Sequence, residues 1–134
     1  MILIDTPIWS MAFRRSNPLS SSIVDEITEL IKDCRAGIIG PIRQEILSGY
    51  SDKNKFCILK EKLDAFPNIP IEAKDYIKAA EFNNACRVAG IQGSHIDFLI
   101  CSVASRLNIQ IFTDDKDFEH YAKHLPIKLY KVKH

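Results

Sequence analysis

Apolar residues along the chain fall into short continuous runs that alternate with longer amphipathic segments. "MILID" at 1–5 and "AGIIGP" at 36–41 are short apolar runs closed by Thr-Pro and Gly-Pro, a pattern typical of buried strands. Between them, residues 20–34 begin with serines that can cap a helix and then place apolar side chains at helical spacing. The chain is therefore predicted to open with a strand, a helix and a second strand.

The same alternation continues to the end of the chain. Residues 109–113 and 127–132 predict two more strands, and "FPNIPI" at 66–71 predicts a weak one. Helical patterns cover residues 41–50, 51–66, 72–90, 94–108 and 115–125. Strands that alternate with helices form right-handed crossovers and a mostly parallel sheet covered on both faces. We therefore expect an α/β fold, a three-layer α/β/α sandwich with a sheet of about five strands, as a single domain over residues 1–134.

The composition is that of a globular protein. Of the 134 residues, 46% are apolar and 26% are charged, which is ordinary for a domain with its own core. The first apolar run is too short for a signal peptide and no later run is long enough to cross a bilayer, so we expect a soluble, cytoplasmic protein. The four cysteines show no CxxC spacing and have apolar neighbours, so we expect buried free thiols rather than disulfides or a zinc site.

Acidic residues stand where separate elements meet the carboxyl edge of the predicted sheet. Asp5 ends the first strand, and the turn at 113–117 follows the strand at 109–113. Glu45 lies one turn into the helix that leaves the second strand, and Asp97 lies in the first turn of a helix that begins at the same edge. The acids of the turn alone also fit a solvated helix cap. Together, however, four segments bring a carboxylate to one place.

Clustered carboxylates favour one kind of chemistry. They raise one another's pKa unless a cation or a proton compensates their charge. Oxygen ligands without cysteine or histidine favour Mg²⁺ or Mn²⁺ over zinc. Such a metal suits phosphodiester hydrolysis, because it lowers the pKa of a bound water and neutralises charge that develops on the phosphate.

At these residues the sequence resembles the PIN-domain family, and in particular the VapC-like toxins of toxin–antitoxin pairs. "LIDTPIWS" is similar to the family's opening strand with its first acid, and "IRQEILSGY" to its second motif. "GSHIDFLICSVA" is similar to the third motif and "IFTDDKDF" to the fourth, so the four occur in the family's order from end to end of the chain. The resemblance implies an endoribonuclease that uses Mg²⁺ or Mn²⁺ to cleave structured RNA such as tRNA. It also implies inhibition by a cognate antitoxin. As the assembly we expect a homodimer.

The resemblance also implies roles for individual residues. The catalytic set would be Asp5, Glu45, Asp97 and Asp115, with Asp5, Asp97 and Asp115 on the metal. In the fourth motif Asp115 fits the Thr-x-Asp pattern best, and Asp117 is the alternative acid. We interpret Asp117 as a supporting or helix-capping residue, and Thr6 and Thr113 as supporting residues.

Several other residues allow two interpretations. Arg14, Arg15 and Arg43 could hold RNA phosphates or belong to a solvated surface. The net charge of +1 does not itself indicate a nucleic-acid partner, although an acidic site would offset a basic rim. Trp9 is interpreted as a core residue rather than a base-stacking one.

Two alternative functions belong to other classes. One is a catalytically inactive PIN-fold module that binds RNA or protein, which the four filled acid positions disfavour. The other is a phosphoacceptor signalling domain, which would need adjacent acids early in the chain, whereas Asp5 stands alone there.

Overall fold

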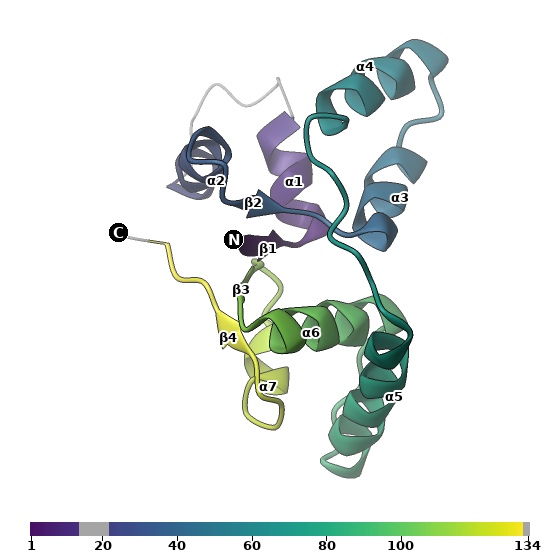
Figure 1. Cartoon of the computed structure of the whole chain (residues 1–134), viewed down its shortest axis with the longest axis vertical. Coiled ribbons are helices and arrows are strands. Elements are labelled where there is room, and N and C mark those ends of the chain that lie inside the picture. Colours follow the sequence, from purple (N-terminus) through teal and green to yellow (C-terminus); the bar gives the residue numbers. More distant parts are fainter. Residues whose placement is uncertain (14–21, 133–134) are drawn as a thin grey trace.

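A parallel sheet of four strands forms the centre of the protein (Figure 1). The computed structural model describes residues 1–13 and 22–132. In spatial order the strands are β2 (Ala36–Gly37), β1 (Ile2–Ile4), β3 (Gln110–Phe112) and β4 (Lys128–Leu129). All neighbouring strands are parallel, and Ile2 pairs with Ala36 on one side and with Gln110 on the other. The α/β class and the parallel sheet are confirmed.

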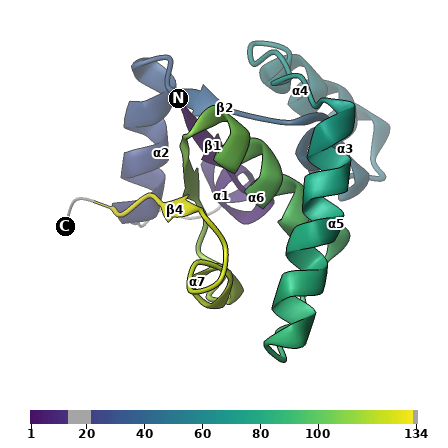
Figure 2. The ribbon, with the colours of Figure 1, turned by 60° about the horizontal axis from the view of Figure 1, so that its bottom comes forward.

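Helices cover both faces of this sheet. In the described ranges they are α1 (Thr6–Phe13), α2 (Ser22–Lys32), α3 (Gly40–Ser48), α4 (Lys53–Leu63), α5 (Ala73–Val88), α6 (His95–Leu107) and α7 (Asp117–Tyr121). Figure 2 shows α2 on one side of the sheet and α6 with α5 on the other, which is the predicted three-layer arrangement. Within the parts of the chain that are described, no helix is both long and apolar enough to span a membrane.

The prediction of about five strands was wrong by one strand. Residues 66–71 form only an isolated bridge, in which Asn68 lies opposite Ile38. The Ile69 N–H donates to the Ile38 carbonyl at 2.8 Å, but Pro67 and Pro70 on either side have no N–H to donate. The segment therefore lies at the edge of the sheet without extending it.

Helix α1 was not predicted, because the Thr-Pro pair was interpreted as the end of a strand. Pro7 instead occupies the second residue of α1, where a missing backbone N–H costs nothing. The Asp5 carbonyl accepts the first hydrogen bonds of the helix, from the N–H groups of Ile8 and Trp9. Trp9 is fully buried with its ring against Phe66, as its interpretation as a core residue requires.

Helix α6 has more buried residues than any other helix in the described part of the chain. Its residues 98–104 are all buried, which the almost wholly apolar sequence of this segment predicted. The Ser94 hydroxyl caps the helix by accepting the Asp97 N–H, and Asn108 ends it in the left-handed conformation. The cap fixes where the first turn lies, and that turn carries Asp97.

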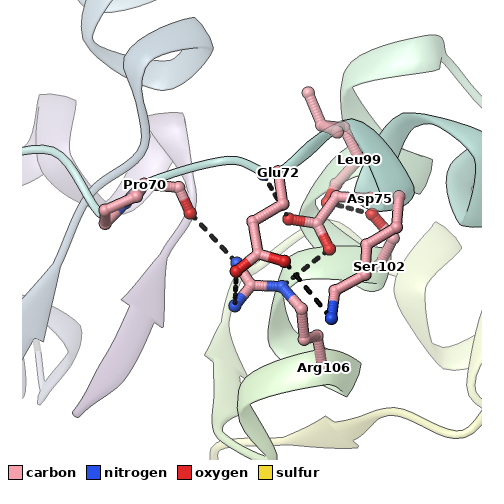
Figure 3. A network of polar contacts seen from close by, with 7 residues as sticks. Pro70, Glu72, Asp75, Leu99, Ser102 and Arg106 are labelled. Carbon is pink, nitrogen blue, oxygen red and sulfur yellow. Dashed lines mark hydrogen bonds and ion pairs between the residues drawn. The ribbon is translucent and has the colours of Figure 1, made fainter.

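A polar network attaches α6 to α5 and to the segment before it (Figure 3). Arg106 donates to the carboxylate of Asp75 at 2.8 Å and to the Pro70 carbonyl at 3.0 Å, and it lies 3.4 Å from a carboxylate oxygen of Glu72. Asp75 is 2% exposed. Burial raises the pKa of Asp75, but the hydrogen bonds from Arg106 and the Glu72 N–H outweigh it and hold the pKa below its usual range.

All four cysteines are free, but they do not share one environment. Cys86 and Cys101 are buried, as predicted. The prediction was wrong for Cys34 and Cys57, which are exposed. Cys34 follows α2 in the left-handed conformation, with φ of 57°, so it belongs to the turn after the helix rather than to its buried face.

Candidate functional site

Asp5 lies at the centre of the polar cluster at the carboxyl edge of the sheet. It follows β1, and its N–H donates to the Phe112 carbonyl of the adjacent strand β3 at 2.9 Å. The side chain is only 6% exposed. The Thr6 N–H donates to Asp5 Oδ1 and the Thr113 hydroxyl donates to Asp5 Oδ2, each at 2.8 Å. Both oxygens of this nearly buried carboxylate therefore accept hydrogen bonds, one from the end of β1 and one from the end of the adjacent strand β3.

Glu45 is attached to the same strand end through Thr6. The Thr6 hydroxyl donates to Glu45 Oε2 at 2.9 Å, across 39 positions of sequence. Glu45 is exposed and belongs to α3, which begins at Gly40 immediately after the chain leaves the sheet. The predicted meeting of Asp5 and Glu45 at one edge is thus observed, with Thr6 between them.

Asp97 approaches from the first turn of α6. Its N–H donates to the Ser94 hydroxyl at 3.0 Å, and its Oδ2 accepts a hydrogen bond from the Tyr121 hydroxyl at 2.8 Å. Its side chain is half-buried. Tyr121, at the end of α7, is fully buried. Tyr121 was not predicted from the sequence, because a tyrosine within a short amphipathic helix gives no signal of a polar partner.

The turn after β3 brings Asp115 toward the cluster. The Asp115 N–H donates to the Thr113 hydroxyl oxygen at 3.1 Å, which links it to Asp5 through one shared hydroxyl. Asp115 is half-buried, whereas Asp114 and Asp117 are exposed. Of the two roles considered for Asp117, helix capping is taken by Asp115, whose Oδ1 accepts the Asp117 N–H at 2.9 Å at the start of α7. The supporting role of Asp117 stays a prediction.

The electrostatics show that these carboxylates affect one another. Burial raises the pKa of Asp5 from 3.8 to about 6, against the hydrogen bonds from Thr113 and Thr6, which lower it. The negative charges of Asp97 and Glu45 are smaller causes of the same rise, and the value of about 6 includes them. The cluster therefore concentrates negative charge in a place where desolvation already disfavours it.

The pKa of the Tyr121 hydroxyl is also raised, by burial and by the negative charges of this cluster. Burial, the hydrogen bond to Asp97 and the charge of Asp97 all raise its pKa, followed by the charges of Asp117 and Asp115. The hydroxyl is consequently neutral over the whole physiological pH range. It contributes a hydrogen-bond donor to the cluster without contributing charge.

The acids of the cluster suit a hard divalent cation by their chemistry, but their spacing limits how many of them can bind one ion. The converging groups are carboxylate oxygens, which Mg²⁺ and Mn²⁺ prefer. Among the described residues, however, no three side chains of the types His, Cys, Asp and Glu are grouped closely enough to enclose an ion. An ion here would be held by one or two carboxylates and by water, which is the usual arrangement for Mg²⁺.

Of the three arginines considered for RNA binding, Arg43 lies among the described residues, where the chain itself binds its guanidinium. Arg43 donates to the Asn68 side chain and to the carbonyls of Leu63 and Phe66, so its guanidinium joins α3 to the segment after α4. These contacts favour a structural role for Arg43 over the predicted phosphate contact. Arg14 and Arg15 lie outside the described residues.

The chain matches the family model of the PIN domain over residues 2–124, a range that contains every candidate acid. It belongs to the PIN domain family. It is 33% identical to the VapC ribonuclease Mb1587 of Mycobacterium bovis over 127 residues, 92% of each chain. It has the same identity and coverage to the ribonuclease VapC11 of Mycobacterium tuberculosis. The resemblance noted in the sequence, to PIN domains of the VapC type, is confirmed.

Solved structures show the same fold. FitAcB from Neisseria gonorrhoeae aligns with a TM-score of 0.78 at 19% identity, over 100% of this PIN domain and 99% of that chain. VapBC2 from Rickettsia felis, bound to a DNA fragment from the promoter, aligns with a TM-score of 0.73 at 20% identity, over 97% and 98% of the two chains.

Proposed function

We propose that this PIN domain is a metal-dependent endoribonuclease and the toxin of a toxin–antitoxin pair. The observation that carries the proposal is the convergence of Asp5, Glu45 and Asp97 from three separate elements, with the pKa of Asp5 raised mainly by burial and to a smaller extent by the charges of the other two. A fold gains no stability from crowding carboxylates in this way. The relatives named as VapC ribonucleases support the ribonuclease activity.

The candidates to hold Mg²⁺ or Mn²⁺ are Asp5, Asp97 and Asp115, of which one or two would contact the ion while water completes its coordination. The ion would supply a water of lowered pKa and positive charge beside the phosphate. Two threonines orient the Asp5 carboxylate for this role: the Thr113 hydroxyl donates to Oδ2 and the Thr6 N–H donates to Oδ1. The Thr113 hydroxyl also accepts the backbone N–H of Asp115. A carboxylate that is already oriented loses less entropy when it binds an ion.

Glu45 would accept a proton from the attacking water. It is exposed, so substrate and solvent can reach it, and the Thr6 hydroxyl holds only one of its oxygens through Oε2. A positioned carboxylate base of this kind contributes to hydrolysis by removing the proton as the new P–O bond forms.

Family membership supports a proposal for the substrate and the partners. We propose structured RNA such as tRNA as the substrate, a cognate antitoxin as the inhibitor, and a homodimer as the assembly. The similarity to VapBC2 and to FitAB, which was solved bound to the IR36 DNA fragment, supports a partner chain of the antitoxin type. Cytoplasmic tRNA would then be the accessible target.

Incubation with total tRNA tests the proposal. Purified protein is incubated with Mn²⁺ or with EDTA, and the products are separated on a denaturing gel. We expect discrete fragments with Mn²⁺, none with EDTA and none from Asp97→Asn. Asp33→Asn, which removes an exposed acid beyond the end of α2, is the matched control and should cleave like the wild type.

Two results would contradict the proposal. Cleavage that persists in EDTA, or in Asp97→Asn, would separate the activity from the acid cluster. Binding of tRNA by a folded, Mn²⁺-loaded protein without turnover would instead favour the inactive binding module.

A further inference from the structure

The carboxylate of Asp97 in the proposed site is hydrogen-bonded to a buried tyrosine, Tyr121, whose hydroxyl lies beside Gly93. The Tyr121 hydroxyl donates to Asp97 Oδ2 at 2.8 Å, and the two residues come from different helices, α7 and α6. The Tyr121 ring is fully buried and contacts the rings of Phe98 and Phe118, with ring centroids 5.1 Å away in both cases. Because the buried ring is packed against two other rings, its hydroxyl is held in place beside Asp97.

Gly93 provides the space that this hydroxyl occupies. A Cβ atom at Gly93 would lie 2.4 Å from the Tyr121 oxygen and 2.8 Å from the terminal carbon of the Phe98 ring. Those separations are shorter than van der Waals contact, so any side chain at Gly93 would displace the tyrosine. Gly93 directly precedes Ser94, the residue that caps α6. The tyrosine, the glycine and the cap are therefore all fitted to the turn that carries Asp97.

We propose that Tyr121 is a positioning residue for Asp97: its hydroxyl occupies Oδ2, orients the carboxylate and leaves Oδ1 for a divalent cation. The inference rests on the proposed function. Hydrogen-bond partners of metal-ligating carboxylates act in this way, and their loss weakens metal binding about 10-fold to 100-fold. A lysine or arginine in the same place would neutralise Asp97 and compete with the cation. A neutral hydroxyl orients the carboxylate and keeps its charge.

The first test measures Mn²⁺ binding without any substrate. We expect Tyr121→Phe to bind Mn²⁺ about tenfold more weakly than the wild type in isothermal titration calorimetry with MnCl₂ as the probe. In tRNA cleavage, the same variant should be slow at low Mn²⁺ and recover the wild-type rate at saturating Mn²⁺. A purely structural role for Tyr121 would lower the rate at all Mn²⁺ concentrations.

Tyr130→Phe is the matched control. The Tyr130 hydroxyl donates to the carboxylate of Glu26, on the other side of the sheet from α6, so the substitution removes the same chemical group from a second carboxylate. It should bind Mn²⁺ like the wild type. Equal weakening in both tyrosine variants would overturn the inference.

Gly93→Ala tests the same contact without changing the tyrosine. It should also weaken Mn²⁺ binding, because it displaces the Tyr121 hydroxyl from Asp97. The double variant Gly93→Ala, Tyr121→Phe should bind Mn²⁺ no more weakly than the weaker of the two single variants. Both changes remove the same hydrogen bond, from Tyr121 to Asp97, so their effects should not add. Losses that multiply would show that the two residues act independently. If Tyr121→Phe fails to fold, Gly93→Ala against the wild type decides the question by itself.

Asp97→Asn separates failure of this inference from failure of the proposed function. If Asp97→Asn binds Mn²⁺ like the wild type, the proposed metal site is wrong. If Asp97→Asn loses Mn²⁺ while Tyr121→Phe and Gly93→Ala retain it, the site stands and the positioning role of Tyr121 is refuted.

Discussion

Replacing Asp5 with asparagine should stabilise the metal-free protein at neutral pH. The folded state raises the pKa of Asp5 from 3.8 to about 6, chiefly through burial and then through its acidic neighbours, although two hydrogen bonds lower it. An acid whose pKa is raised on folding favours the folded state below the unfolded pKa, and this contribution is lost as the pH rises toward the folded pKa. Ionised Asp5 is therefore a destabilising group above about pH 6.

The magnitude follows from the size of the shift. Raising the pKa of Asp5 from 3.8 to about 6 corresponds to a loss of roughly 3 kcal/mol in free energy of unfolding when Asp5 is ionised. This loss is complete at about pH 7.5, about half as large near pH 5 and nearly absent below about pH 4. Asparagine can retain both hydrogen bonds, because its Oδ1 can accept the Thr6 N–H and its amide can donate to the Thr113 oxygen. We therefore expect Asp5→Asn to gain up to about 3 kcal/mol in free energy of unfolding at pH 7.5.

Urea unfolding in EDTA measures this gain at several pH values. The difference between Asp5→Asn and the wild type should shrink as the pH falls, and added Mn²⁺ should stabilise the wild type more than the variant. Asp114→Asn, an exposed acid in the turn after β3, should change the free energy of unfolding by less than about 0.5 kcal/mol. A loss of stability in Asp5→Asn that does not vary with pH would refute the reasoning.

Three further predictions concern the supports of the site. Arg106→Leu leaves Asp75 buried without its cation and should lower the free energy of unfolding by about 3 kcal/mol in urea titrations; a loss below about 1 kcal/mol would contradict this. Thr113→Val removes a hydrogen bond that lowers the pKa of Asp5, so NMR titration of that carboxyl should give a higher pKa in the variant than in the wild type, and an equal or lower pKa would contradict this. Glu45→Gln should reduce the rate of tRNA cleavage about a hundredfold and leave the melting temperature unchanged. A lower rate together with a lower melting temperature would assign Glu45 to folding.

The sequence predicted the position of the acids better than the details of the sheet. Asp5 and Thr113 were placed together because parallel strands deliver their carboxyl ends to one edge, a rule that depends only on the order of strands and helices. The segment at 66–71 was predicted as a strand from its isoleucines, yet its two prolines lack the N–H groups that a strand requires. Helix α1 was missed because Thr-Pro fits the end of a strand and the start of a helix equally well.

Contacts between side chains of different elements could not be predicted from local pattern. Tyr121 was not recognised because its partner Asp97 lies 24 positions away and on another helix. Arg43 was left open between an RNA phosphate contact and a solvated surface, whereas in the fold it donates to the carbonyls of Leu63, at the end of α4, and of Phe66 beyond it. Only the three-dimensional structure decides whether a polar side chain contacts a substrate or the chain itself.

The most direct test of the central claim is the rate of tRNA cleavage as a function of Mn²⁺ concentration, for the wild type and for Asp97→Asn. A rate that rises from zero to saturation in the wild type and stays at zero in the variant would show that the acid cluster forms a metal-dependent ribonuclease site. A rate independent of Mn²⁺, or the same curve for both proteins, would contradict it.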